Sequence, residues 1–149
     1  MTAPPLDPTG ADQRLRIVYC AVPDRGTGDR IARLAVEGRY AACVHAWPIR
    51  SVYWWKGKVE DGEEWALLLK SSPKKLGALF ELLAREHPYE VPEILEIRVP
   101  RAHEPYVQWL LATIDPESAE PPTRPRPAGS RRARGARDRR QTRAPRRRP

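Results

Sequence analysis

The segment that most constrains the fold is residues 87–94, which reads His-Pro-Tyr-Glu-Val-Pro-Glu-Ile. Each of its two prolines fixes its own φ angle and disfavours helical geometry at the residue before it. An apolar helical pattern, with Leu76, Leu79 and Leu83 on one face, ends directly before this run. Residues 87–94 are therefore predicted to form a stiff, non-helical crossover that holds its polar side chains in place.

The chain between residues 14 and 115 predicts alternating strands and helices. The apolar patterns predict strands at 14–21, 42–56, 65–69 and 95–99, and helices at 27–38, 73–86 and 104–114. Pro48 favours an edge position or a bulge in the second strand, and Glu-Asp-Gly-Glu at 60–63 predicts the hairpin turn. This order is that of an α+β, ferredoxin-like split βαβ fold with an extra C-terminal helix.

The helices of this arrangement cover one face of the sheet and leave the other face open. A chain with five Trp and five Tyr would rarely leave such a face in water. We therefore expect an oligomer that covers it.

Charge divides the chain into a nearly neutral domain and a basic tail. Residues 116–149 hold 12 Arg and seven Pro with almost no aliphatic residues, which predicts a disordered tail that contacts polyanions. A solvated extension without a dedicated partner is the alternative. Residues 1–13, rich in Pro and polar residues, are predicted to be a disordered arm, and residues 14–115 the domain.

The same sequence favours a cytoplasmic protein. The first 13 residues lack the apolar run of a secretory signal, and no segment approaches membrane-spanning length. With two cysteines and no export signal, a reduced environment and no membrane insertion are expected.

Cys43 and His45 are the first candidates for metal ligands. Residues i and i+2 of a strand point to the same face, about 6–7 Å apart, and a thiolate with an imidazole suits copper or zinc. The favoured alternative is that Cys43 is a small apolar filler, since cysteine is among the most buried residue types. Cys20 should lie two strand spacings from Cys43, roughly 9–10 Å away, which excludes a disulfide between them.

His87 and Glu90 are further candidates on the stiff segment. His87 could ligate a metal or bind an anion, or it could end the preceding helix as a cap. Two carboxylates, Glu90 and Glu93, beside one His would suit a divalent ion, although a solvated acidic loop has the same composition.

Three stretches together resemble one family, the CutA-type divalent-ion tolerance proteins. They are residues 87–94, Ala-Ala-Cys-Val at 41–44 and Ser-Val-Tyr-Trp-Trp-Lys-Gly-Lys at 51–58, and the resemblance runs from about residue 15 to 114. It implies a homotrimer that binds divalent ions, requires no cofactor and contributes to metal tolerance.

The resemblance also bears on single residues. Cys20 and Cys43 fall where relatives carry Cys, whereas His45 replaces the usual Asn. Some relatives carry further Cys or His at the positions of Leu82 and Glu86, which weakens a thiolate-rich copper site here.

Aromatic and basic residues suggest subunit contacts. The family uses the hairpin motif formed here by Tyr53, Trp55 and Lys58 between subunits, and Tyr106 with Trp109 has the helical spacing of core or interface residues. The resemblance leaves one alternative function, a signalling trimer of the PII kind. Lys70, Tyr106 and Glu90 would then meet around an anionic effector between subunits.

Other classes are disfavoured. The sequence contains no nucleophile elbow or cofactor loop, and an acylphosphatase-like site would need an Asn, which the chain lacks entirely. Residues 65–69 read Trp-Ala-Leu-Leu-Leu, without the stacking motif of RNA-recognition modules. The leading hypothesis is a non-enzymatic trimer that binds copper or another divalent ion.

Overall fold

A computed structural model describes residues 14–117 of the chain. The predictions for the arm at 1–13 and for the tail beyond Glu117, including its polyanion contact, lie outside these residues. The elements are, in order, β1 (Arg16–Val22), α1 (Arg25–Glu37), β2 (Cys43–Trp55), β3 (Lys58–Ser71), α2 (Pro73–Glu86), β4 (Ile94–Arg98) and α3 (Glu104–Ile114).

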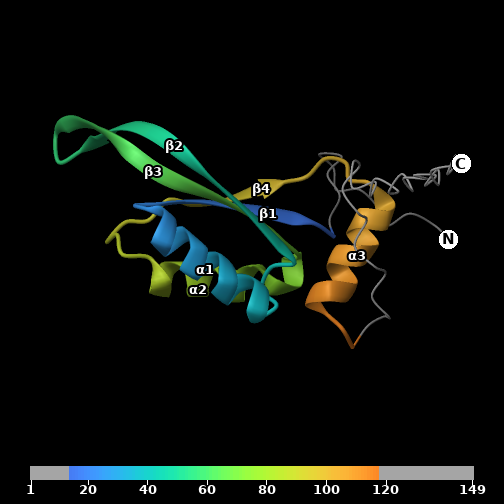
Figure 1. Cartoon of the computed structure of the whole chain (residues 1–149). Helices are drawn as coiled ribbons and strands as arrows, with labels where there is room; N and C mark the ends of the chain where they lie inside the picture. The colour runs from blue at the N-terminus through green and yellow to red at the C-terminus, as the bar shows by residue number, and fades with distance from the viewer. Residues whose placement is uncertain (1–13, 118–149) are drawn as a thin grey trace, which may run out of the picture.

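The predicted split βαβ arrangement is confirmed. The four strands form one antiparallel sheet in the order β2-β3-β1-β4, so β3 separates the first two strands. Figure 1 shows α1 and α2 together beneath one face of the sheet, α3 at the end where β1 begins, and the β2–β3 hairpin reaching beyond the helices.

The hairpin turn differs from the prediction. The turn lies at Lys56 and Gly57, both with positive φ, and β2 and β3 pair without a break from Trp55–Lys58 to Cys43–Lys70. Two consecutive residues with positive φ make the two-residue turn whose twist matches that of the strands, and Gly favours that geometry. The acidic residues 60–63 are therefore part of β3, and Pro48 lies in an edge strand without a bulge.

Local signals explain where the first two helices begin and end. Asp24 caps α1 by accepting a hydrogen bond from the Thr27 backbone N–H at 2.8 Å, so the helix begins two residues before the predicted position. Ser72 precedes α2 as predicted, with Pro73 in its first turn, but its side chain makes no capping hydrogen bond. His87 ends α2 as the predicted cap, through its backbone N–H to the carbonyl of Leu83.

Two apolar clusters form the core. The larger lies between the sheet and the two helices beneath it and includes Val18, Cys20, Ile31, Leu67 and Leu83. The smaller lies where α3 closes the end of the sheet, and its buried members are Leu15, Ala42, Leu110 and Ile114. The second cluster explains why the terminal helix belongs to the domain.

The opposite side of the sheet, called the open face below, has no covering element among the described residues. Strand alternation and register place two cross-strand rows on it, Cys43–Lys70–Ile17–Ile97 and His45–Leu68–Tyr19–Leu95. Leu95 and Ile97 remain about half exposed there, at 49% and 44%. The open face therefore presents exposed apolar side chains on β4 in the same rows as the candidate ligands, which lie at the opposite edge of the sheet.

Candidate functional site

Cys43 and His45 lie side by side on the open face, as the sequence predicts. Both belong to the edge strand β2, where Cys43 is partly exposed and His45 is exposed. Lys70 lies opposite Cys43 on β3, and its Nζ is 3.9 Å from the cysteine sulfur. This pair can supply one thiol and one imidazole to a ligand that approaches the open face.

Cys20 lies on the other side of the sheet. It is fully buried in the larger core cluster, and burial raises the pKa of its thiol to about 12, with Glu93 and Glu64 adding to the effect. Cys43 is opposite Lys70 and Ile17, three residues along β1 from Cys20, so the two cysteines are roughly 14 Å apart. Both are free, which confirms that no disulfide joins them.

His87 is held by hydrogen bonds at both ring nitrogens. Its Nε2 lies 2.7 Å from the carbonyl oxygen of Ala21, and its Nδ1 accepts from the Tyr89 backbone N–H at 3.1 Å. Because a carbonyl can only accept, Nε2 carries the ring hydrogen and Nδ1 carries none. The imidazole joins the end of α2 to the end of β1 and offers no free lone pair in this arrangement.

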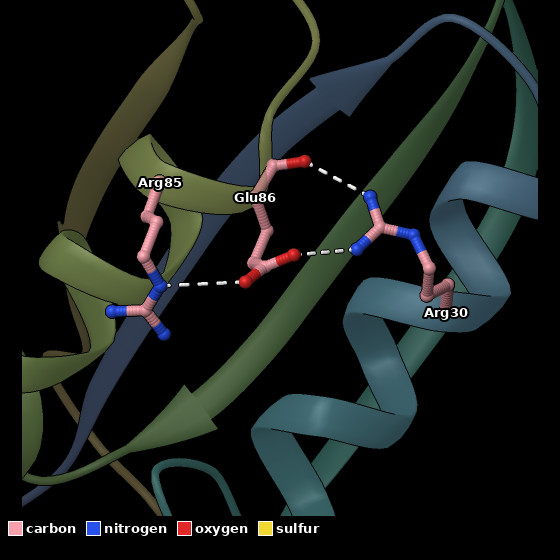
Figure 2. Close-up of polar contacts among 3 residues, drawn as sticks. All are labelled: Arg30, Arg85 and Glu86. Atoms are coloured by element: carbon pink, nitrogen blue, oxygen red, sulfur yellow. Dashed lines mark hydrogen bonds and ion pairs between the residues drawn. The ribbon is translucent and has the colours of Figure 1, made fainter.

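An ion-pair cluster fixes the helix end from which His87 projects. Arg30 of α1 donates to the Glu86 carboxylate at 2.6 Å and to the Glu86 carbonyl oxygen at 3.0 Å, and Arg85 approaches the same carboxylate at 3.3 Å (Figure 2). The hydrogen bond from Arg30 lowers the pKa of Glu86. Because that carbonyl belongs to the last turn of α2, Arg30 satisfies one acceptor that a helix end leaves without an internal partner.

The 88–93 segment and the hairpin line a groove of about 920 Å³. Tyr89 anchors the segment by donating from its hydroxyl to Glu64 of β3 at 3.0 Å, and burial together with Glu64 raises the pKa of Tyr89 to about 12. Glu90 and Glu93 line the groove with Glu64, opposite the aromatic hairpin residues Tyr53, Trp54 and Trp55. The groove is both acidic and aromatic.

The remaining predicted residues fall into two separate places. Tyr53, Trp55 and Lys58 are exposed on the hairpin, whereas Tyr106 and Trp109 pack against the smaller core cluster with their ring centroids 5.5 Å apart.

A single chain does not bring Lys70 and Glu90 together. Lys70 pairs with Ile17, whereas Glu90 shares the groove with Ala21, and the four residues of strand between Ile17 and Ala21 span about 13 Å. A cavity that joins Lys70 and Glu90 would therefore need more than one chain.

Within residues 14–117, no three His, Cys, Asp or Glu side chains are grouped closely enough to hold a metal ion. Sequence reasoning missed Arg30 and Glu64, which hold the start of the 87–94 segment through Glu86 and Tyr89. The role of Arg30 could not be read from its neighbours in the sequence, since its contact with Glu86 spans 56 residues.

Among residues 14–117, every helix is too short or too polar to cross a membrane.

Comparison with known proteins gives a consistent result. The family described as CutA1 divalent ion tolerance protein matches residues 16–113. The divalent-cation tolerance protein CutA of Thermotoga maritima is 37% identical over 98 residues, which are 66% of this chain and 97% of that protein.

Solved structures agree. The periplasmic divalent cation tolerance protein CutA of Archaeoglobus fulgidus superposes with a TM-score of 0.66 at 30% identity, covering 68% of this chain and 99% of that one. CutA of Synechococcus elongatus gives a TM-score of 0.67 at 31% identity over 70% and 93% of the two chains.

The fold, with its long hairpin and its open sheet face, defines a small α+β protein of the ferredoxin-like class. With the matches above, this chain belongs to the CutA1 divalent ion tolerance family.

Proposed function

We propose that this protein is a non-enzymatic homotrimer that binds copper or another divalent cation through Cys43 and His45 and so contributes to the response to metal ions. The observation that carries the proposal is the position of this pair on the open face, in the same rows as apolar residues that water would otherwise contact. A contact that buries these residues brings the ligands of neighbouring subunits towards one another.

The apolar surface supports the assembly. Leu95 and Ile97 are exposed on the open face, and on the hairpin Val52 and Trp54 are 71% and 74% exposed. Exposed apolar surface of this extent favours association, because burying it contributes about 25 cal/mol per Å². The number of subunits, three, follows from the resemblance to the CutA family. The groove beside the hairpin would accept part of a neighbouring subunit.

The small number of ligands in one chain also supports a metal site formed by more than one chain. One thiol and one imidazole are two ligands, whereas zinc takes four and copper sites commonly take three or more. Since residues 14–117 offer no closer group of three, further ligands would come from symmetry-related copies. Cys20 and His87 keep their packing and hydrogen-bonding roles in this proposal, and Glu90 remains a candidate oxygen ligand in the groove.

Lys70 provides a separate test of the metal site, because its ammonium group lies 3.9 Å from the sulfur of Cys43. A positive charge there repels a metal cation. Replacing Lys70 with the neutral side chain of Met should therefore tighten metal binding.

We also propose a cytoplasmic, reducing setting in which Cys43 stays a thiol, although the Archaeoglobus relative is described as periplasmic.

Calorimetric titration of the full-length protein with Cu(I), Cu(II) and Zn(II) tests the metal site. Wild type should bind saturably, Cys43→Ala and His45→Ala should each weaken binding at least about tenfold, and Lys70→Met should strengthen it. His103→Ala is the matched control, because His103 is exposed at the start of α3, away from the open face. The tail contains no Cys or His and can remain in place.

Weak binding that is the same in all of these variants would reject the metal site. Sedimentation equilibrium tests the assembly separately. Leu95→Asp with Ile97→Asp should give monomers where wild type gives trimers. A monomeric wild type would overturn the trimer, whatever the titrations show.

A further inference from the structure

A second hollow lies at the opposite end of the domain from the groove. It has a volume of about 330 Å³ and lies between the first turn of α2 and the last turn of α3. We call this hollow the α2 pocket. Its lining residues are Arg14, Ser72, Pro73, Lys74, Lys75, Leu111, Ile114 and Asp115.

Ser72 is the unusual residue of the α2 pocket. It occupies the N-cap position of α2 in extended geometry, yet its hydroxyl does not make the bond to the helix backbone that such a residue normally makes. The residue is only 6% exposed, it lines the pocket, and the described part of the chain gives the hydroxyl no hydrogen-bond partner. No buried side-chain oxygen or nitrogen of residues 14–117 lacks a partner, so this hydroxyl reaches the solvent of the pocket, where it can donate to a bound acceptor.

The charges around Ser72 favour an anion. The lining contains the cations Arg14, Lys74 and Lys75 against one carboxylate, Asp115. The N-terminus of the 14-residue helix α2 adds the positive end of its dipole, although Pro73 has no N–H and the Lys75 N–H already donates to the Ser72 carbonyl at 3.1 Å.

Two of the three cations already have partners. Lys74 Nζ is 2.9 Å from Asp115 Oδ2, and Arg14 pairs with Glu104 at 2.7 Å. Asp115 therefore competes with any incoming anion for Lys74.

The far wall of the pocket is apolar. Leu111 and Ile114 of α3 lie there, and Pro73 lies in the first turn of α2. The volume exceeds that of an inorganic phosphate ion, so a ligand with a small apolar body fits better than a bare oxyanion.

We propose that the α2 pocket binds a phosphoryl dianion, and that the preferred ligand is a small phosphate monoester. Its phosphoryl oxygens accept from the Ser72 hydroxyl, from the ammonium group of Lys75 and from the start of α2. Its organic part lies against Leu111 and Ile114. This site is independent of the open face and of the proposed metal ligands.

Nuclear magnetic resonance of the full-length ¹⁵N-labelled protein tests the proposal, because it locates binding despite the twelve arginines of the tail. Phenyl phosphate should shift the amides of residues 72 and 74–76 saturably at concentrations up to about 10 mM. Inorganic phosphate should do so more weakly, because it lacks the organic part that lies against Leu111 and Ile114, and equal affinity would overturn the preference for a monoester. Shifts confined to the tail would overturn the proposal.

Three variants and one control make the test specific. Ser72→Ala and Lys75→Gln should each weaken binding about tenfold, because each removes a donor to a charged group. Asp115→Asn should tighten it about fivefold, because it removes the competing carboxylate. Arg33→Gln, on the exposed side of α1, should change nothing. Equal affinity in all four would mean an adventitious ion only and would refute the site.

Discussion

The two faces of the one sheet differ more than any other two regions of this molecule. On β3, Leu67 and Leu69 point towards the helices and are fully buried, whereas Leu68 between them points to the open face and is only half buried. The same contrast divides the cysteines, since Cys20 lies inside the core and Cys43 lies on the open face. Residue type alone does not distinguish the two faces.

The contrast shows where the fold of one chain ends and where assembly begins. The helix-covered face is complete, because α1 and α2 bury it, and Arg30 of α1 pairs with Glu86 at the end of α2. The open face has comparable apolar residues without cover in residues 14–117. A face of this composition serves association or binding, and it holds the candidate ligands.

The largest expected effect comes from comparing Leu67 with its neighbour Leu68. Leu67→Ala should lower the free energy of unfolding by about 2–5 kcal/mol, because it leaves a cavity in a packed core. Leu68→Ala should cost the subunit about 1 kcal/mol and should act mainly on association. Urea unfolding measures the first effect, and sedimentation velocity measures the second.

The comparison would fail if both substitutions destabilised the chain equally while the oligomer remained intact. The two faces would then be equally buried within one subunit. Val18→Ala, on the helix face of β1, should behave like Leu67→Ala and is the matched control.

The second effect is the reactivity of the two thiols. With a pKa raised to about 12 by burial, Cys20 should have only about one thiolate in ten thousand at pH 8. In the Leu95→Asp, Ile97→Asp variant, whose open face is uncovered, iodoacetamide should therefore label Cys43 and leave Cys20 unmodified, and mass spectrometry should find two labels after unfolding. Native Cys43→Ser should take up no label, and any labelling of Cys20 in it would contradict the burial described here.

Most of the fold could be predicted from the sequence because local patterns specify it. The alternating apolar residues of β4 and the helical spacing of α2 and α3 predicted those elements closely. The predicted position of the hairpin turn was wrong, because Glu-Asp-Gly-Glu at 60–63 has the composition of a turn. The real turn depends on the positive φ of Lys56 and Gly57. Composition favoured residues 60–63, and only the continuous pairing of β2 with β3 shows that the turn lies at residues 56–57.

The candidate site could be predicted only in part. The i, i+2 spacing placed Cys43 and His45 on one face correctly, because a strand fixes that relation locally. The two hydrogen bonds of the His87 ring could not be predicted, since one of them joins residues 66 apart in the sequence. The unpartnered hydroxyl of Ser72 was also missed, because its sequence context is that of an ordinary helix cap.

The smallest effect concerns α3, which closes the end of the sheet with an ion pair at the surface as well as apolar contacts. The hydrogen bond from Arg14 lowers the pKa of Glu104 from 4.5 to about 2, with Gln108 contributing. Because the folded pKa lies below the unfolded one, this pair stabilises the fold above about pH 4.5, and the contribution disappears as the pH falls towards 2.

Glu104→Gln should therefore lower the thermal unfolding midpoint slightly at pH 7, and the difference from wild type should shrink between pH 4.5 and pH 2. Scanning calorimetry in buffers without phosphate measures both midpoints and avoids the α2 pocket, which Arg14 also lines. The difference at pH 7 should also shrink in high salt, because the pair is at the surface. A difference that stayed constant with pH would mean that Glu104 holds α3 through packing rather than charge. The end of the sheet would then resemble the interior of the helix-covered face, where apolar packing dominates.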